Sequence, residues 1–362
     1  MRKEQGLGAR GKVAEEVLRE AFHYAFPLVA MGRQRLAVLG TEPAPGRNVL
    51  QRWYHRRELS RPELRGVTTP NADTLYSVLW LDLSQGPFRL SMPDTDGRYY
   101  SLAFLDMATN NFAMLGRRTT GTRAGSFIIV GPDCRHELPG NSRVIRAPGN
   151  DVLVASRILV NGDEDIAAVT ALQDQYEVEA LASDPVPPLW RHPPPAGDGP
   201  EAFVNMASLM LERNPPPRYE ARMLERLASV GIGAAGCRWD TLPGESRDLW
   251  TAQWPSLLAS LESGLASEAA DANGWHYSRD SLGNFGTDYV YRAQIALGAL
   301  LALEPVEAIY PSASVDNTGK PLSGTHRYRL TLRPDDLPVN AFWSLTLYQV
   351  EPDGKLYFTA NP

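Results

Sequence analysis

The sequence has little cysteine, no long hydrophobic run and no excess of basic residues. Its two cysteines, Cys134 and Cys237, lie far apart in a chain of 362 residues, which argues against a disulfide framework or a CxxC metal or redox pair. The longest apolar run, residues 293–303, is interrupted by Gln294 and is far shorter than the roughly 20 residues that span a membrane. We therefore expect no membrane partner.

The charge of the chain also excludes one class of partner. The formal net charge is -6, and basic residues are interleaved with acidic ones, so no clustered surface for nucleic-acid phosphates is predicted. The N-terminus has Arg2 and Lys3, but acidic residues follow in place of an apolar segment, so no signal peptide is visible. We expect a cytoplasmic location.

What is present is an ordinary globular composition, with 43% hydrophobic and 22% charged residues, in a chain long enough for two or three domains. Residues 12–26 have the apolar spacing of an amphipathic helix that Pro27 should kink or end. Short segments rich in β-branched and aromatic residues follow, separated by Gly or Pro. They predict strands at 74–83, 88–92, 98–106, 111–118, 125–130, 143–147 and 151–160.

The middle of the chain has a helical pattern. We expect a helix from about Asp163 or Asp165 to Leu181, an extended Pro-rich linker over residues 184–200, and then further helices. The predicted helices are 201–212, 218–230, 247–263 and 288–303. The last part returns to strands, at 327–333, 341–350 and 355–359, with Asp353-Gly354 as a hairpin turn.

Two sets of motifs follow one another along the chain. The first set is Asn71-Ala72-Asp73-Thr74-Leu75-Tyr76-Ser77, Gly97-Arg98-Tyr99-Tyr100, Asp106, Asn110-Asn111, Gly116-Arg117 and Thr120-Gly121. The second set is Tyr289 to Ala293, Ala308-Ile309-Tyr310-Pro311, Gly319-Lys320-Pro321-Leu322 and Ala341-Phe342-Trp343-Ser344-Leu345-Thr346-Leu347-Tyr348. The first set resembles the bacterial family catalogued as domain of unknown function 1254, and the second resembles its companion domain 1214.

The strand periodicity of residues 74–160 predicts an antiparallel sandwich or barrel. The resemblance implies a mixed fold that is mainly β with an α-helical middle: two antiparallel β-sandwich domains, jelly-roll-like, joined by a helical region. The expected divisions are an N-terminal lead-in at 1–70, a first sandwich at 71–162, a helical region at 163–305 and a partial second sandwich at 306–362. The resemblance also implies further strands after Asn361-Pro362, so the chain is expected to be shortened there. An unpaired sheet edge would then favour a homodimer or poor solubility.

Two aspartates are the candidates for catalysis. Asp73 and Asp106 lie near strand ends, where two carboxylates can act as general acid and base if burial or repulsion separates their pKa values. Each also fits a structural role, Asp73 in a turn with Asn71.

Other polar residues of this region are candidates for substrate binding. Arg98 and Arg117 can clamp an anion with their guanidinium groups, although an ion pair with Asp106 or Asp82 is equally consistent. Asn71, Tyr76 and Tyr100 complete the predicted set, and the tyrosines also fit the rim of a core. The six histidines have no metal-binding spacing, so no metal site is predicted, and no cofactor is indicated.

Two functions fit these residues. One is an enzyme that acts on a small polar or anionic molecule by acid–base chemistry. The other is a non-catalytic module that binds carbohydrate or another small ligand. Either function implies a small-molecule ligand.

Overall fold

The structure is a computed structural model of the chain. It describes residues 2–39, 50–63, 65, 68–182, 197–233, 236–265, 270–272, 274–333, 337–352 and 354–359. The predicted linker 184–200 lies mostly outside these residues, as does Asp353 of the predicted hairpin turn. No helix in these ranges is both long and apolar enough to cross a membrane.

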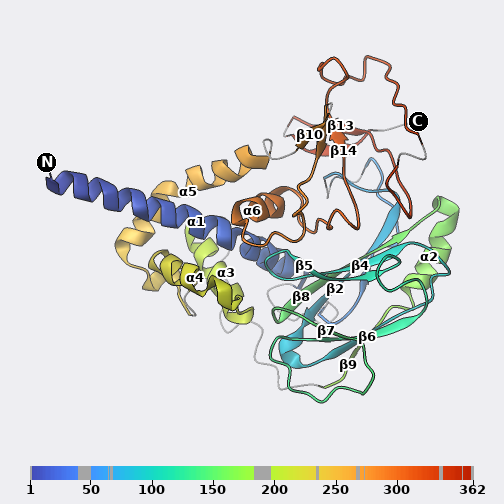
Figure 1. Ribbon diagram of the computed structural model, residues 1–362, viewed down its shortest axis with the longest axis horizontal. Coiled ribbons are helices and arrows are strands. Elements are labelled where there is room, and N and C mark those ends of the chain that lie inside the picture. Colours follow the sequence, from blue (N-terminus) through green and yellow to red (C-terminus); the bar gives the residue numbers. More distant parts are fainter. Residues whose placement is uncertain are drawn as a thin grey trace.

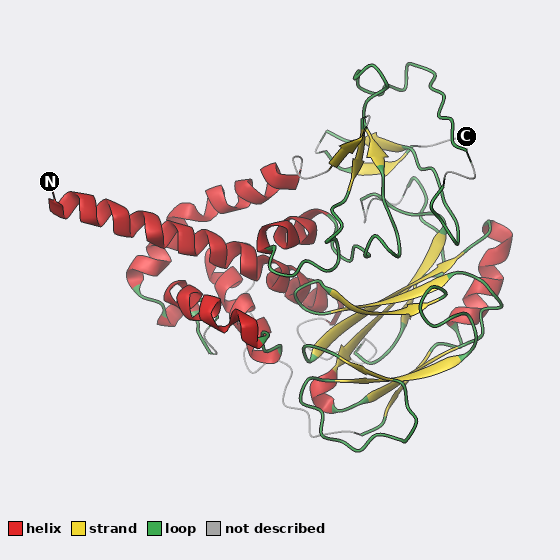
Figure 2. Ribbon diagram, viewed as in Figure 1, coloured by secondary structure: helices red, strands yellow, loops and turns green. Residues whose placement is uncertain are grey.

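The described helices form a group on one side of the molecule, except α2 (Figures 1 and 2). They are α1 (Arg2–Leu39), α2 (Ile166–Gln173), α3 (Pro200–Arg213), α4 (Ala221–Leu227), α5 (Gly244–Leu265) and α6 (Tyr289–Gly298), with short 3-10 turns that include η3 (Arg218–Glu220). The prediction was that Pro27 kinks or ends the helix, and α1 does not end there but continues to Leu39. Phe22, Leu28 and Met31 are buried on both sides of the proline, so packing offsets the lost backbone hydrogen bond.

The strands of the first half form two sheets. A five-stranded sheet has the order β1-β2-β8-β4-β5, and a four-stranded sheet has the order β7-β6-β3-β9. The strands are β1 (Tyr54–His55), β2 (Thr74–Asp82), β3 (Phe88–Met92), β4 (Tyr100–Leu105), β5 (Asn111–Gly116), β6 (Gly125–Val130), β7 (Val144–Arg146), β8 (Asp151–Leu159) and β9 (Glu177–Ala180). All neighbours are antiparallel except β6 and β7.

These two sheets share one hydrophobic cluster. Leu79 of β2, Phe104 of β4 and Val154 of β8 contribute from the five-stranded sheet, and Phe88 and Ile129 from the other sheet. The opposite face of the five-stranded sheet packs in part on the helices, through Trp80, Leu105 and Leu153. The five-stranded sheet is therefore a central layer with a second sheet on one face and helices on the other.

Residues 163–181 do not form one helix. Helix α2 ends at Gln173, and β9 then pairs with β3 from Glu177↔Ser91 to Ala180↔Phe88. Pairing with an available sheet edge therefore overrides the local helical pattern.

The C-terminal strands are shorter than predicted, and the predicted strand 327–333 is not formed. Described there are β12 (Ser312–Ala313), β13 (Tyr348–Val350) and β14 (Leu356–Phe358), with β12 joined to β11 (Trp275–Tyr277) and β10 (Ala270–Ala272). Residues 327–333 and 341–347 are not strands, and Leu345 and Leu347 are 65% and 71% exposed. A strand needs a neighbour for its backbone hydrogen bonds, and these segments have none among the described residues.

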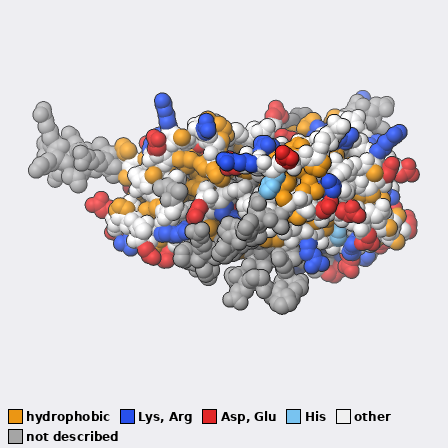
Figure 3. All heavy atoms as spheres, turned by 90° about the horizontal axis from the view of Figure 1, so that it is seen from below, with side chains coloured by type: hydrophobic (Ala, Val, Ile, Leu, Met, Phe, Trp, Pro, Cys, Tyr) orange, Lys and Arg blue, Asp and Glu red, His pale blue; other side chains and the backbone are white. Residues whose placement is uncertain are grey.

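The overall fold class is therefore mixed, with several antiparallel sheets, and helices hold more residues than strands. The prediction that the chain is mainly β is therefore wrong. On the surface face of Figure 3, acidic and basic side chains interleave, as the sequence predicts.

Candidate functional site

The two predicted catalytic acids lie at opposite ends of the five-stranded sheet. β2 and β4 are both antiparallel to β8, so they run in the same direction. Asp73 precedes β2, whereas Asp106 follows β4. They do not form a pair, and the predicted acid–base couple between them is corrected.

Asn71 acts as a turn residue. Its Oδ1 accepts hydrogen bonds from the backbone nitrogens of Asp73 at 2.6 Å and Thr74 at 3.0 Å. This is the structural alternative that the sequence offered, an Asx turn that starts the strand.

The two predicted arginine clamps are also placed apart. Arg98 donates to Asp165 from Nη1 at 2.5 Å and from Nη2 at 2.8 Å, and this hydrogen-bonded pair lowers the pKa of Asp165. Its partner is thus neither a substrate nor Asp106 or Asp82. Arg117 is exposed on the turn after β5.

The predicted tyrosines face opposite sides of the sheet. Tyr100 is 1% exposed and belongs to the cluster between the sheets, so its predicted substrate contact is corrected. Tyr76 is half-buried on the other face, where the guanidinium carbon of Arg157 lies 5.3 Å from its ring centroid.

Asp106 belongs to a polar cluster that four distant parts of the chain build. We call it the Arg292 cluster, and it consists of Tyr24 (α1), Asp106 (the turn after β4), Glu220 (η3), Tyr289 and Arg292 (α6). α1 and α6 pack against each other, and both lie near the end of β5 in Figure 1.

Arg292 is the centre of this cluster. It is 3% exposed, and its guanidinium carbon lies 5.5 Å from the ring centroid of Tyr24 and 4.8 Å from that of Tyr289. Its Nε is buried without a hydrogen-bond partner among the described residues. A buried cation with an unused donor is costly, so it marks a position where a ligand atom would be stabilising.

Glu220 is held by two tyrosine hydroxyls. Tyr24 donates to Oε2 at 2.8 Å, and Tyr289 donates to Oε1 at 3.2 Å, while Glu220 itself is 4% exposed. Burial and the neighbouring carboxylate raise the pKa of both tyrosines, that of Tyr289 to about 12. Both phenols therefore keep their protons at neutral pH and can donate them.

Asp106 lies in a strained turn. It accepts hydrogen bonds from the backbone N of Asn110 at 2.9 Å and from Nδ2 at 3.1 Å, while burial raises the pKa of its carboxyl. Within this turn Thr109 has a φ of 69° and a buried Oγ1 with no partner among the described residues. A β-branched residue in the left-handed region is strained, and such strain concentrates at functional sites.

The cluster has the parts for proton transfer next to an anion. Arg292 supplies positive charge, Asp106 is a carboxyl that retains its proton more readily than usual, and Glu220 is a second carboxyl group with hydroxyl donors. Exposed Tyr219 and half-buried Asp106 and Tyr289 place one side of the cluster at the surface.

Tyr24, Glu220 and Arg292 were not among the site residues predicted from the sequence. Arg292 had a usable signal, because it is a charged residue within a predominantly apolar predicted helix. Tyr24 and Glu220 had none, since they reach the cluster only through the packing of α1 and η3.

A serine–histidine contact lies elsewhere. His55 Nδ1 is 2.8 Å from Ser77 Oγ, and Gln173 Nε2 donates to the same oxygen at 3.0 Å. Ser77 is 1% exposed, so this pair is closed to a substrate and acts as a buried link between β1, β2 and α2.

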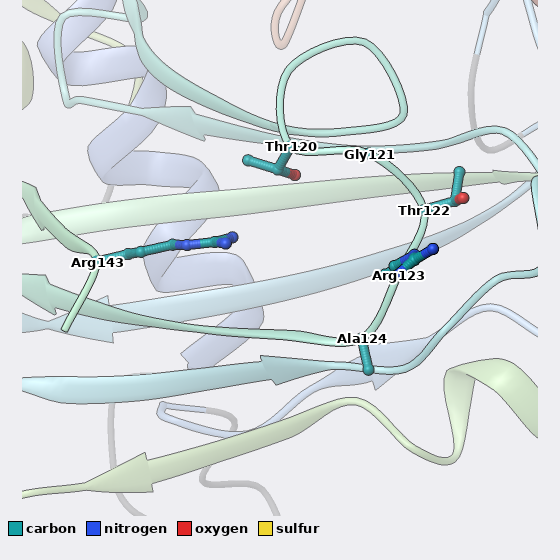
Figure 4. Close-up of a pocket in the computed structure, with 6 residues that line it drawn as sticks. All are labelled: Thr120, Gly121, Thr122, Arg123, Ala124 and Arg143. Carbon is teal, nitrogen blue, oxygen red and sulfur yellow. The ribbon is translucent and has the colours of Figure 1, made fainter. Parts of the chain in front are cut away.

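A surface hollow of about 430 Å³ is separate from the Arg292 cluster. Thr120, Gly121, Thr122, Arg123, Ala124 and Arg143 line it, and Figure 4 shows Arg143 extending across it toward the 120–124 loop. Both arginines are exposed, where solvent screens their charge. No group of three or more His, Cys, Asp or Glu in the described part of the chain could hold a metal ion.

Two regions of the chain match known protein-family models. Residues 50–180 match the family model Protein of unknown function (DUF1254), and residues 307–361 match Protein of unknown function (DUF1214). The chain therefore contains a DUF1254 region and a DUF1214 region. The DUF1254 match contains both sheets and Asp106, whereas Tyr24, Glu220 and Arg292 lie outside both matches.

One solved structure supports the fold. The VPA0106 protein of Vibrio parahaemolyticus is 24% identical, with a TM-score of 0.66 over 86% of this chain and 73% of that one. An uncharacterized protein from Burkholderia cenocepacia is 12% identical, covering 56% of this chain and 55% of that one, with a TM-score of 0.24. The first likeness concerns fold alone, and the second is too weak to carry an argument. No curated protein matches this chain.

Proposed function

We propose that this protein is an enzyme that acts by acid–base chemistry on a small anionic molecule bound at the Arg292 cluster. The observation that carries the proposal is the buried Arg292 guanidinium, whose Nε lacks a partner and which lies beside a carboxyl with a raised pKa. A carboxylate or a similar anion matches the planar donors of arginine.

The proposed roles follow from the surroundings of each group. Arg292 binds and orients the anion between the two tyrosine rings. Asp106, which burial favours in its protonated form, acts as the acid. Glu220 accepts a proton on the other side, with the Tyr24 and Tyr289 hydroxyls holding its oxygens in place.

A second candidate is binding without turnover. Glu220 is tied by two hydroxyls and Arg292 is flanked by two rings, an arrangement that also suits a rigid ligand site. In this case the two sheets that share a core would form a β-sandwich that carries the site on its helical side. A cytoplasmic location and a homodimer stay predictions.

The test is a ligand screen followed by turnover. Thermal shifts with small carboxylates, phosphates, sugars and nucleotides identify the stabilising class, and mass spectrometry then detects any product. The enzyme hypothesis expects Asp106→Asn to abolish turnover while retaining binding, and Arg292→Lys to weaken binding about tenfold or more. Arg61→Ala is the control, since that side chain is exposed.

Three outcomes separate the hypotheses. Stabilisation by one class without any product supports the binding module. A product whose formation is unaffected in both Asp106→Asn and Arg292→Lys places the chemistry elsewhere. Stabilisation by sugars alone, unchanged in Arg292→Lys, contradicts an anion site.

A further inference from the structure

A second polar site lies at the far end of the same sheet, on the face opposite the shared core. Cross-strand pairing places Tyr76 of β2 beside Arg157 of β8, and Arg157 beside Ser101 of β4. Side chains of paired residues stand on one face, so these three form a row across the sheet. In Figure 1 the C-terminal segment lies on this side of the sheet, away from β6 and β9.

Arg157 has a positive charge that no described carboxylate pairs with. Its Nη1 donates to the hydroxyl of Tyr310 at 2.6 Å, and its guanidinium carbon lies 5.3 Å from the Tyr76 ring centroid. A guanidinium has five N–H donors, so one neutral hydroxyl and one ring leave most of its hydrogen-bonding capacity unused.

The carboxylate of Glu307, which accepts a hydrogen bond from Tyr99 beside Arg157, is already engaged. Glu307 accepts from the Tyr99 hydroxyl at 2.7 Å and from Arg118 Nε at 2.6 Å, and its side chain is 2% exposed. Glu307 therefore compensates Arg118, and the charge of Arg157 is left for another partner.

An apolar floor adjoins the arginine. One step further along the strands on the same face lie Val78, Ala155, Ala103 and Met114, which pair across β2, β8, β4 and β5. Val78, Ala155 and Met114 are only half-buried, although they belong to the interior of the sheet. Residues two apart in a strand are about 7 Å apart, so the floor begins within one side-chain length of the guanidinium.

We propose that this face binds an amphiphilic carboxylate, with its anionic head on Arg157 and its apolar body on the floor formed by Val78, Ala155 and Met114. The positive charge of Arg157 favours a ligand with an anionic group. The half-buried apolar side chains beside it favour a hydrocarbon chain over a second polar group. Tyr76 and Tyr310 flank the head and supply ring faces and a hydroxyl. This site is independent of the Arg292 cluster, which lies at the other end of β4.

The experiment measures octanoate binding to the full chain by isothermal titration calorimetry. Acetate lacks the apolar body and 1-octanol lacks the charge, so both should bind at least about tenfold more weakly than octanoate. Arg157→Met keeps the apolar stem and removes the charge, and it should weaken octanoate binding by a similar factor. Arg61→Ala, a change at an exposed arginine outside both sites, should leave octanoate binding unchanged.

A second variant keeps the test valid if Arg157→Met does not fold. Ala155→Leu fills the floor without touching the arginine and should also weaken octanoate binding, with circular dichroism confirming the fold. The proposal is overturned if wild-type protein does not bind octanoate, or if a folded Arg157→Met or Ala155→Leu variant binds it as tightly as wild type. Loss of octanoate binding in Arg292→Met would instead assign it to the other cluster and overturn this one.

Discussion

Arg213 donates two hydrogen bonds to Asp151, from Nε at 2.7 Å and from Nη2 at 2.6 Å, and so fastens the end of α3 to the start of β8. Asp151 is fully buried, and Arg35 of α1 also pairs with it at 3.0 Å. Burial alone would raise the pKa of Asp151, but the two arginines hold it below its usual range. This network joins the helical side to the central sheet.

We predict that Arg213→Ala lowers the free energy of unfolding by about 3–5 kcal/mol, because Arg213 pairs with the buried carboxylates of both Asp82 and Asp151, and Arg35 alone would remain beside Asp151. Urea denaturation at pH 7 measures the change. Arg61→Ala is the matched control, since the Arg61–Asp163 pair is 63% and 70% exposed and should contribute less than about 1 kcal/mol. Equal losses in the two variants would contradict a dominant role for the buried network.

The same network predicts acid sensitivity. The folded-state pKa of Asp151 lies below its ordinary value of 3.8, so its contribution is complete above that value and is lost as the pH falls through the folded-state pKa. Wild-type stability should therefore decline below about pH 4. Asp151→Asn should be less stable at pH 7 and show a shallower decline in that range, as measured by denaturation at several pH values.

The burial of His23 predicts a second decline in stability on acidification, which begins at a higher pH than the decline caused by Asp151. It is 6% exposed, and burial, with Arg19 nearby, lowers its pKa from 6.5 to about 4. The unfolded chain therefore takes up the proton first, so stability is complete above pH 6.5 and falls as the pH decreases toward 4. His23→Gln should remove up to about 3 kcal/mol of this decline. His326→Gln, at an exposed position, is the control, and an identical slope in both variants would exclude His23 as the cause.

Asp106→Asn tests whether the ionised carboxyl of Asp106 destabilises the folded protein at neutral pH. Because burial raises the folded-state pKa of Asp106, its contribution to stability is present below the ordinary value of 3.8 and is lost as the pH rises through the folded-state pKa. At pH 7 the neutral amide should therefore be as stable as the wild type or more so, while turnover is lost. A clear drop in melting temperature would indicate that the carboxylate is structural.

Gly116 is required by a close backbone approach. Its φ is +141°, and a Cβ there would lie 2.3 Å from the carbonyl oxygen of Tyr100. Gly116→Ala should lower the free energy of unfolding by about 3 kcal/mol or more, because the backbone at Tyr100 or at residue 116 must move to make room for the methyl group. At Gly121 the φ is +81° and nothing lies within 4 Å of a Cβ, so Gly121→Ala should cost only about 1–2 kcal/mol. Thermal denaturation of both variants gives the comparison.

The strands of residues 74–160 were predictable because each carries its own signal. Residues 88–92 and 125–130 form strands at the predicted bounds, since turn residues punctuate apolar alternation there. Residues 327–333 have a similar pattern but no neighbouring strand among the described residues, and they do not form one. Periodicity indicates which side chains could share a face, whereas pairing depends on what the rest of the chain places alongside.

In the candidate site, local roles could likewise be predicted from the sequence, whereas long-range partners could not. Asp106 was a candidate from its place after a strand, and Asn71 from its place in a turn, because both roles are local. The partner of Arg98 is Asp165, which lies 67 residues away, and no local pattern selects it over Asp82 or Asp106. The prediction of an Asp73–Asp106 pair was wrong because strand order and direction, which the sequence does not display, separate the two ends of the sheet.

The sequence by itself determined the two families, most of the strands and helices, and Asp106 as a residue to test, since these depend on short-range spacing and ordered motifs. Tertiary structure alone decided that Asp106 lies with Tyr24, Glu220 and Arg292, residues from four separate parts of the chain. It also decided that Arg157 lies beside Tyr76 and Tyr310, with no carboxylate partner among the described residues. The reason is physical: the electrostatics of a buried group depend on every neighbour that folding brings to it, and most of those neighbours are distant in sequence.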